Sequence, residues 1–264
     1  MAESGSLLSA GAALGLLPVA LAQNARLRSD ALSLSPPEAN PEGHAGVVGA
    51  PPLELLVLGE GAAICGGSVG VDESLPSRLA YGLGVRLGRR VHWRALGRAS
   101  WTAADADTAL RRDGVPAADI AFVTLGLNDA VTMTSTSTWR RHLGRLVGRL
   151  FDAGVGVVAL SGVPPLGKLP GLGWPLAPLL GLRGRALDRS LAAFVRRQAL
   201  APEHTLVRVP VPRPSRRADF GEDGVHPSAR ACAVWSARAA EQLAGEYAAL
   251  PRAFPLPLAR LATR

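Results

Sequence analysis

Four short motifs carry the polar groups of this 264-residue chain that are best suited to chemistry. They read Gly-Glu-Gly from Gly59, Gly-Arg-Ala-Ser from Gly97, Gly-Leu-Asn-Asp from Gly126 and Asp-Gly-Val-His-Pro from Asp223. A histidine, a carboxylate and an amide are groups that acid–base and oxyanion chemistry use. Taken singly, each motif has a structural interpretation, because Gly, Asn and Asp are common in turns and helix caps. Their meaning therefore depends on whether the fold brings them together.

Short apolar runs alternate with amphipathic stretches along the chain. The pattern predicts strands at 53–58, 91–96, 120–125, 155–160 and 205–209, and helices at 75–87, 102–111, 139–150, 182–198 and 227–247. Such alternation is typical of parallel pairing in a doubly wound, three-layer α/β/α domain of the flavodoxin-like kind, here with about five strands. Ligands bind beyond the carboxyl ends of the strands in such sheets. All four motifs lie where that site is expected.

The ordered set resembles the SGNH (GDSL-type) ester hydrolases. That family has Gly-Asp-Ser after the first strand, Gly after the second, Gly-x-Asn-Asp after the third and Asp-x-x-His near the end. The resemblance covers residues 53–247. It implies the SGNH hydrolase fold and an esterase- or lipase-like activity, hydrolysis or acyl transfer, on an acyl ester or lipid-like small molecule, without a cofactor.

The resemblance also assigns roles. His226 is expected to act as the general base, and Asp223 to hold its imidazole in the right tautomer. The expected oxyanion donors are the side-chain amide of Asn128 and the backbone N–H groups of Gly97 and Gly61.

Gly61 stands where the family places its nucleophilic serine, and glycine has no group that can attack an ester. Removing such a nucleophile costs on the order of 10⁶ in turnover. A substitute nucleophile could come from Cys65, Ser68 or Ser100. Alternatively, the His–Asp pair could activate a water or an acceptor hydroxyl, or the serine was removed deliberately. The rival interpretation is an inactive pseudo-hydrolase that binds an acylated or glycosyl ligand.

The composition of the chain indicates which classes of binding partner are expected. The net charge of +8 comes almost wholly from arginine, and Lys168 is the only lysine. The arginines are scattered without interleaved aromatic residues, so the sequence does not predict nucleic-acid binding. The two cysteines, Cys65 and Cys232, form no disulfide framework, and the absence of CxxC and HExxH patterns predicts no metal site.

Four segments are expected: an anchor or signal-like segment at 1–28, a flexible linker at 29–52, the hydrolase-like domain at 53–248 and a tail at 249–264. Residues 6–22 are apolar and uncharged, a length at the short end for a membrane span. Arg26 and Arg28 follow that run, which favours membrane attachment with the domain on the cytoplasmic side. The alternative is secretion after cleavage of a signal peptide.

A Pro/Gly/Leu-rich insertion at 164–182 contains Trp174, Leu176, Leu179 and Leu180. It is either an apolar lid or acyl-chain wall near the site, or a long loop packed on the core.

Overall fold

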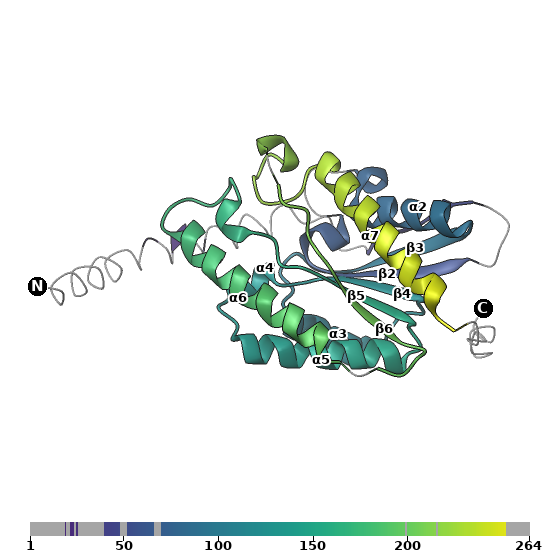
Figure 1. Ribbon diagram of the computed structural model, residues 1–264. Helices are drawn as coiled ribbons and strands as arrows, with labels where there is room; N and C mark the ends of the chain where they lie inside the picture. The colour runs from purple at the N-terminus through teal and green to yellow at the C-terminus, as the bar shows by residue number, and fades with distance from the viewer. Residues whose placement is uncertain are drawn as a thin grey trace, which may run out of the picture.

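The computed structural model describes residues 19, 22–23, 25, 40–47, 52–65, 70–198, 200–214 and 216–251. A sheet with strand order β1-β3-β2-β4-β5-β6 forms the middle layer (Figure 1). The strands are β1 (Glu42–Gly46), β2 (Leu53–Gly59), β3 (Arg90–Gly97), β4 (Ile120–Thr124), β5 (Val157–Ser161) and β6 (Thr205–Val209). Strands β2 to β6 pair in parallel, whereas β1 runs antiparallel to β3. The expected doubly wound α/β architecture is confirmed.

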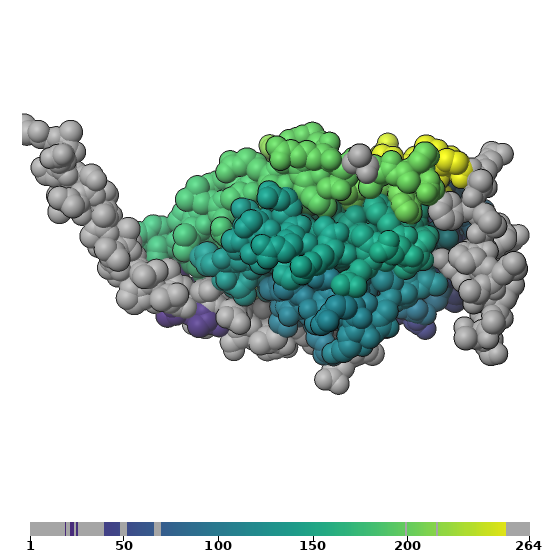
Figure 2. Space-filling model, turned by 90° about the horizontal axis from the view of Figure 1, so that it is seen from below, coloured from purple at the N-terminus to yellow at the C-terminus, as the bar shows by residue number. Residues whose placement is uncertain are grey.

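Helices cover both faces of the sheet. One face carries α2 (Leu75–Leu87) and α7 (Ala229–Ala249), and the other carries α3 (Ala103–Asp113), α5 (Thr136–Asp152) and α6 (Leu176–Arg196). Seen from below, the second group forms a continuous surface over the sheet (Figure 2). The shorter helices are η1 (Gly61–Ile64), η2 (Val71–Glu73), α4 (Leu127–Val131), η3 (Leu166–Lys168) and η4 (Arg217–Asp219).

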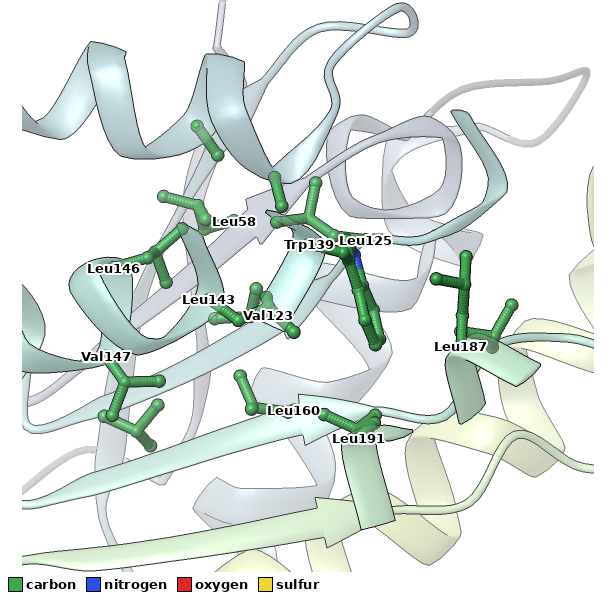
Figure 3. Packing of buried hydrophobic residues seen from close by; sticks show 14 of the residues in the cluster. Leu58, Val123, Leu125, Trp139, Leu143, Leu146, Val147, Leu160, Leu187 and Leu191 are labelled. Atoms are coloured by element: carbon green, nitrogen blue, oxygen red, sulfur yellow. The ribbon is translucent and has the colours of Figure 1, made fainter. Parts of the chain in front are cut away.

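Burial on both faces explains the apolar strands. Every residue of β4 and β5 is buried, as expected for parallel strands between two helical layers. Trp139 of α5 lies against Leu125 with Leu187 and Leu191 of α6 beside it, and it is 1% exposed (Figure 3). The helical spacing of the apolar residues in α5 directs one face of that helix onto this cluster.

One expectation about the domain start is wrong. Residues 42–46, assigned to a flexible linker, form the edge strand β1, so the sheet has six strands. This strand buries no side chain of its own, which is why no apolar pattern announced it. It is held instead by pairing with β3, by the ion pair Glu42–Arg94 at 3.0 Å and by a tilted contact between the rings of His44 and His92, whose centroids are 4.7 Å apart.

Three helix starts differ from expectation by two residues or more, and the first is that of α5, which begins at Thr136 rather than at residue 139. Helix α6 begins at Leu176 rather than at residue 182, because the last seven residues of the Pro/Gly/Leu-rich insertion at 164–182 are helical. Helix α7 begins at Ala229 rather than at Pro227, since the hydroxyl of Ser228 accepts the N–H of Ala231 and caps the helix.

The expected membrane anchor at 1–28 and the tail at 249–264 lie almost wholly outside the described residues. Among the residues that are described, no helix combines the length and apolarity needed to cross a bilayer.

Candidate active site

The carboxyl ends of β2, β3 and β4 meet closely, and glycines permit it. A Cβ on Gly97 would overlap the carbonyl of Gly59, its partner in the parallel register. A Cβ on Gly59 would likewise overlap the carbonyl of Thr124, and Gly59 has a φ of +145°, which side chains rarely adopt. The first three sequence motifs are thereby brought to one edge of the sheet, as predicted.

The histidine arrives on a loop that is tightly bonded to itself. Phe220 and Pro227 form an antiparallel bridge, and the N–H of Gly221 donates to the carbonyl of His226 at 2.9 Å. The guanidinium of Arg217 donates to the carbonyls of Gly221 at 2.6 Å and of Glu222 at 2.8 Å. Arg217 therefore ties down the loop, a function that no sequence pattern indicated.

The predicted His–Asp pair is present. One carboxylate oxygen of Asp223 accepts the backbone N–H groups of Val225 and His226, at 3.0 and 3.1 Å, and the other is hydrogen-bonded to His226 Nδ1. Burial raises the pKa of Asp223, but these hydrogen bonds outweigh it and leave the pKa below its usual value. A carboxylate bonded to Nδ1 directs Nε2 outward as the nitrogen able to take a proton.

Gly61 lies next to that nitrogen. It starts η1 with a φ of +47°, and an ideal Cβ on it would be 3.3 Å from both Nε2 and Cδ2 of His226. Apart from Gly61 itself and its two chain neighbours, no other described residue places an atom within 4 Å of that Cβ position. Two residues 165 positions apart in sequence are thus adjacent in the fold.

Glu60 organises the turn between β4 and α4. Its two carboxyl oxygens accept the backbone N–H groups of Leu127 at 2.7 Å and of Asn128 at 2.8 Å. Burial raises the pKa of Glu60 to about 8, against the lowering effect of these two donors. The position of Glu60 is thus structural, and it links the first and third motifs.

Two of the expected oxyanion donors are already engaged. The amide of Asn128 donates to the carbonyls of Ala99 at 2.6 Å and of Trp101 at 3.0 Å. The N–H of Gly97 donates to the side-chain oxygen of Asn40 at 3.3 Å. An amide has only two N–H bonds to give, so in this conformation Asn128 supports the loop after β3.

The expected substitute nucleophiles gain no support. The side chain of Cys65 is buried, and this burial raises the pKa of its thiol, which disfavours the reactive thiolate. Ser68 lies outside the described residues. Ser100 is exposed on the turn after β3.

A cavity of about 240 Å³ opens beside Gly61 and His226. Its apolar lining includes Leu125, Leu169, Phe220 and Trp235. The first residues of the insertion at 164–182 line this cavity. Leu176 and Leu180 are instead buried in the core, and Trp174 is 67% exposed. The insertion is therefore part cavity wall and part helix.

Comparison with known proteins agrees with this geometry. The profile of the GDSL-like lipase/acylhydrolase family matches residues 59–234. A search of curated proteins finds no significant match. Among solved structures, a family 3 carbohydrate esterase from Clostridium thermocellum is 16% identical with a TM-score of 0.56, over 76% of this chain and 100% of its own.

Two further structures have the same fold. A protein named TesA is 17% identical with a TM-score of 0.56, over 73% of this chain and 99% of its own. A member of the lipolytic G-D-S-L family from Veillonella parvula is 13% identical with a TM-score of 0.53, over 72% of this chain and 97% of its own. At these identities the likeness concerns the fold alone. The family profile, however, spans more than half of the sequence, and the chain belongs to the GDSL-like lipase/acylhydrolase family.

Proposed function

We propose that this protein hydrolyses or transfers an acyl ester, with His226 acting as general base on a nucleophile that the chain itself does not supply. One observation carries the proposal: a Cβ on Gly61 would stand 3.3 Å from His226 Nε2, and beyond the chain neighbours of Gly61 only the His226 ring lies within 4 Å of it. Where relatives have a serine, the glycine leaves that space to a water or an acceptor hydroxyl.

The proposed step needs no group beyond those described. The oxygen of the water attacks the acyl carbonyl carbon while Nε2 takes a proton from it, and Asp223 stabilises the imidazolium. The tetrahedral intermediate then breaks its bond to the alcohol oxygen, which recovers the proton from Nε2. An acceptor hydroxyl in place of water gives acyl transfer. The backbone N–H of Gly61 is the oxyanion donor with no acceptor among the described residues.

The substrate is proposed to be a small acyl ester or a lipid-like ester. The apolar lining of the cavity supports this assignment, as do structural neighbours described as a carbohydrate esterase and a lipolytic protein.

Hydrolysis of p-nitrophenyl acetate tests the proposal. We expect the natural protein to hydrolyse this ester slowly, and His226→Gln to lower the rate by about 10-fold to 100-fold, at or below the low end of the usual contribution of a general base. Arg140→Gln, a change on an exposed residue of α5, is the matched control. Equal rates for the natural protein and His226→Gln would refute a general-base role.

A second function is favoured by a different observation. The N–H groups of Asn128 and Gly97 already donate hydrogen bonds to acceptors of the protein itself. The stabilisation of an oxyanion is therefore weaker than the family pattern implies. We therefore propose, as the alternative, a pseudo-hydrolase that binds an acylated or glycosyl ligand without turnover. Saturable ligand binding combined with no His226-dependent hydrolysis would select this alternative.

Membrane attachment through residues 1–28, with the domain facing the cytoplasm, remains a proposal, with secretion as its alternative. Fractionation of cells that express the full chain, compared with a chain lacking residues 1–28, tests it. Recovery of both chains in the same fraction would contradict attachment through this segment.

A further inference from the structure

One wall of the cavity is a basic face of α7. Arg230, Val234 and Arg238 line the cavity at four-residue intervals, so they lie on the same side of the helix. A third arginine, Arg213, lines the cavity from the loop that follows β6. Three of the scattered arginines of the sequence thus converge on a single cavity.

Little negative charge balances these side chains. Arg230 Nε lies 3.6 Å from a carboxylate oxygen of Asp219, and among the described residues this is the one ion pair that the three arginines make. For Arg213 and Arg238, the described residues provide no hydrogen-bond or ion-pair partner, and both are exposed. The other carboxyl group in the lining, Glu60, is buried and directed at two backbone N–H groups.

The spacing along α7 gives the approximate length of a matching ligand. Arg230 and Arg238 are eight residues apart, which corresponds to about 12 Å of helix. Val234 lies between them and is 42% exposed despite its apolar side chain. His226 lies just before the first turn of the helix. A ligand that extends from His226 along α7 would therefore pass Arg230, then the apolar side chain of Val234, and then Arg238.

We propose that the ligand of this cavity carries a phosphate group on the portion that extends from His226 along α7, where Arg213 and Arg238 bind it. The inference rests on the proposed function for the position of the ester bond, but the binding of the anion does not require turnover. Guanidinium groups match phosphate oxygens with paired N–H donors, and two unpartnered arginines suit a doubly charged group.

Calorimetric titration of the full protein with octyl phosphate and with octanol tests the proposal. We expect octyl phosphate to bind at least about 10-fold more tightly than octanol. The double variant Arg213→Gln/Arg238→Gln should lose that advantage while its affinity for octanol stays the same. Arg140→Gln, on the opposite helical layer, is the control and should leave both affinities unchanged.

Three outcomes would overturn the proposal: equal binding of octyl phosphate and octanol, an equal loss in the double variant and in Arg140→Gln, or octanoate binding as tightly as octyl phosphate. The last would show that any anion suffices. Inorganic phosphate alone should bind weakly, since it has no apolar chain that could contact Val234. His226→Gln separates the two proposals, because it should lower the rate of ester hydrolysis by about 10-fold to 100-fold and leave octyl phosphate binding intact.

Discussion

Gly61 is the residue at which the chain departs from the expected catalytic pattern, and a Cβ added there would contact His226. We expect Gly61→Ser to raise the hydrolysis of p-nitrophenyl acetate by about 100-fold or more, a fraction of the ~10⁶ that a serine nucleophile contributes. The gain is limited because Asn128 and Gly97 already donate inside the protein. Gly61→Ala adds the same Cβ without a hydroxyl and is the matched control. A Ser variant no faster than the Ala variant would show that the site no longer supports serine chemistry.

The same substitutions have a cost in stability. The φ of +47° at Gly61 lies in the left-handed region, and an added Cβ would make a tight 3.3 Å contact with His226. We expect Gly61→Ser and Gly61→Ala each to lower the free energy of unfolding by about 1 kcal/mol. Urea denaturation measures this, and no loss in either variant would mean that the turn after β2 relaxes freely.

Glu60 predicts a pH dependence of stability. Its pKa is about 8 in the folded protein and near 4.5 when unperturbed, so the native state binds more protons between these values. The free energy of unfolding should therefore fall as the pH rises from about 5 to 8. In Glu60→Gln we expect this fall to be smaller by about 3 kcal/mol, the contribution of the raised pKa over that pH range. The variant should nevertheless be less stable at pH 5, because one N–H loses its acceptor. Parallel pH profiles for the two proteins would contradict the raised pKa.

At the scale of elements, the loop from residue 219 to 228 decides where the imidazole lies. Gly224 has a φ of +66°, and a Cβ on it would lie 2.6 Å from the backbone nitrogen of Gly171. We expect Gly224→Ala to lower the free energy of unfolding by about 2 kcal/mol, from combined steric overlap and strain. It should also reduce octyl phosphate binding, because the loop forms part of the cavity wall.

Gly148 provides the comparison for that variant. It lies inside α5, and a Cβ on it would meet no atom within 4 Å. Gly148→Ala should raise the free energy of unfolding by about 0.5–1 kcal/mol, because alanine is the better helix former. Denaturation of the two variants side by side distinguishes a local requirement for glycine from a general effect of the substitution.

The bounds of helices and strands could be predicted from the sequence where their burial imposes a periodic pattern of apolar residues. Helix α2 and strand β6 have the expected bounds, and the other core strands agree within two residues. The His–Asp pair was predictable because the three-residue spacing lets one carboxylate bond both the backbone and the ring. The orientation of Asn128 was not, since it depends on the carbonyls of Ala99 and Trp101, which belong to a loop without a periodic pattern.

At the scale of the whole molecule, β1 decides where the folded domain begins. The sequence predicted a start at residue 53, because residues 42–46 have no apolar periodicity and bury no side chain. Strand β1 instead packs closely because its glycines have no side chain. A Cβ on Gly46 would lie 2.8 Å from Gly84 Cα on α2, and a Cβ on Gly43 would lie 3.0 Å from the indole of Trp93. Close backbone packing of this kind leaves no signal in hydrophobicity.

Gly46→Ala tests this boundary. If β1 is part of the folded domain, the added Cβ would overlap α2 and the carbonyl of Arg89 at a φ of +87°, and we expect a loss of about 2 kcal/mol in the free energy of unfolding. If residues 29–52 behave as a flexible linker, the variant should unfold like the natural protein. Gly70→Ala is the control, because a Cβ on Gly70 would meet nothing within 4 Å. Asn40, which accepts the Gly97 N–H, lies just before β1, and β1 pairs with residues 90–94 of β3. Loss of this edge should therefore also free the Gly97 N–H, so Gly46→Ala in the Gly61→Ser background measures whether that N–H can serve the oxyanion.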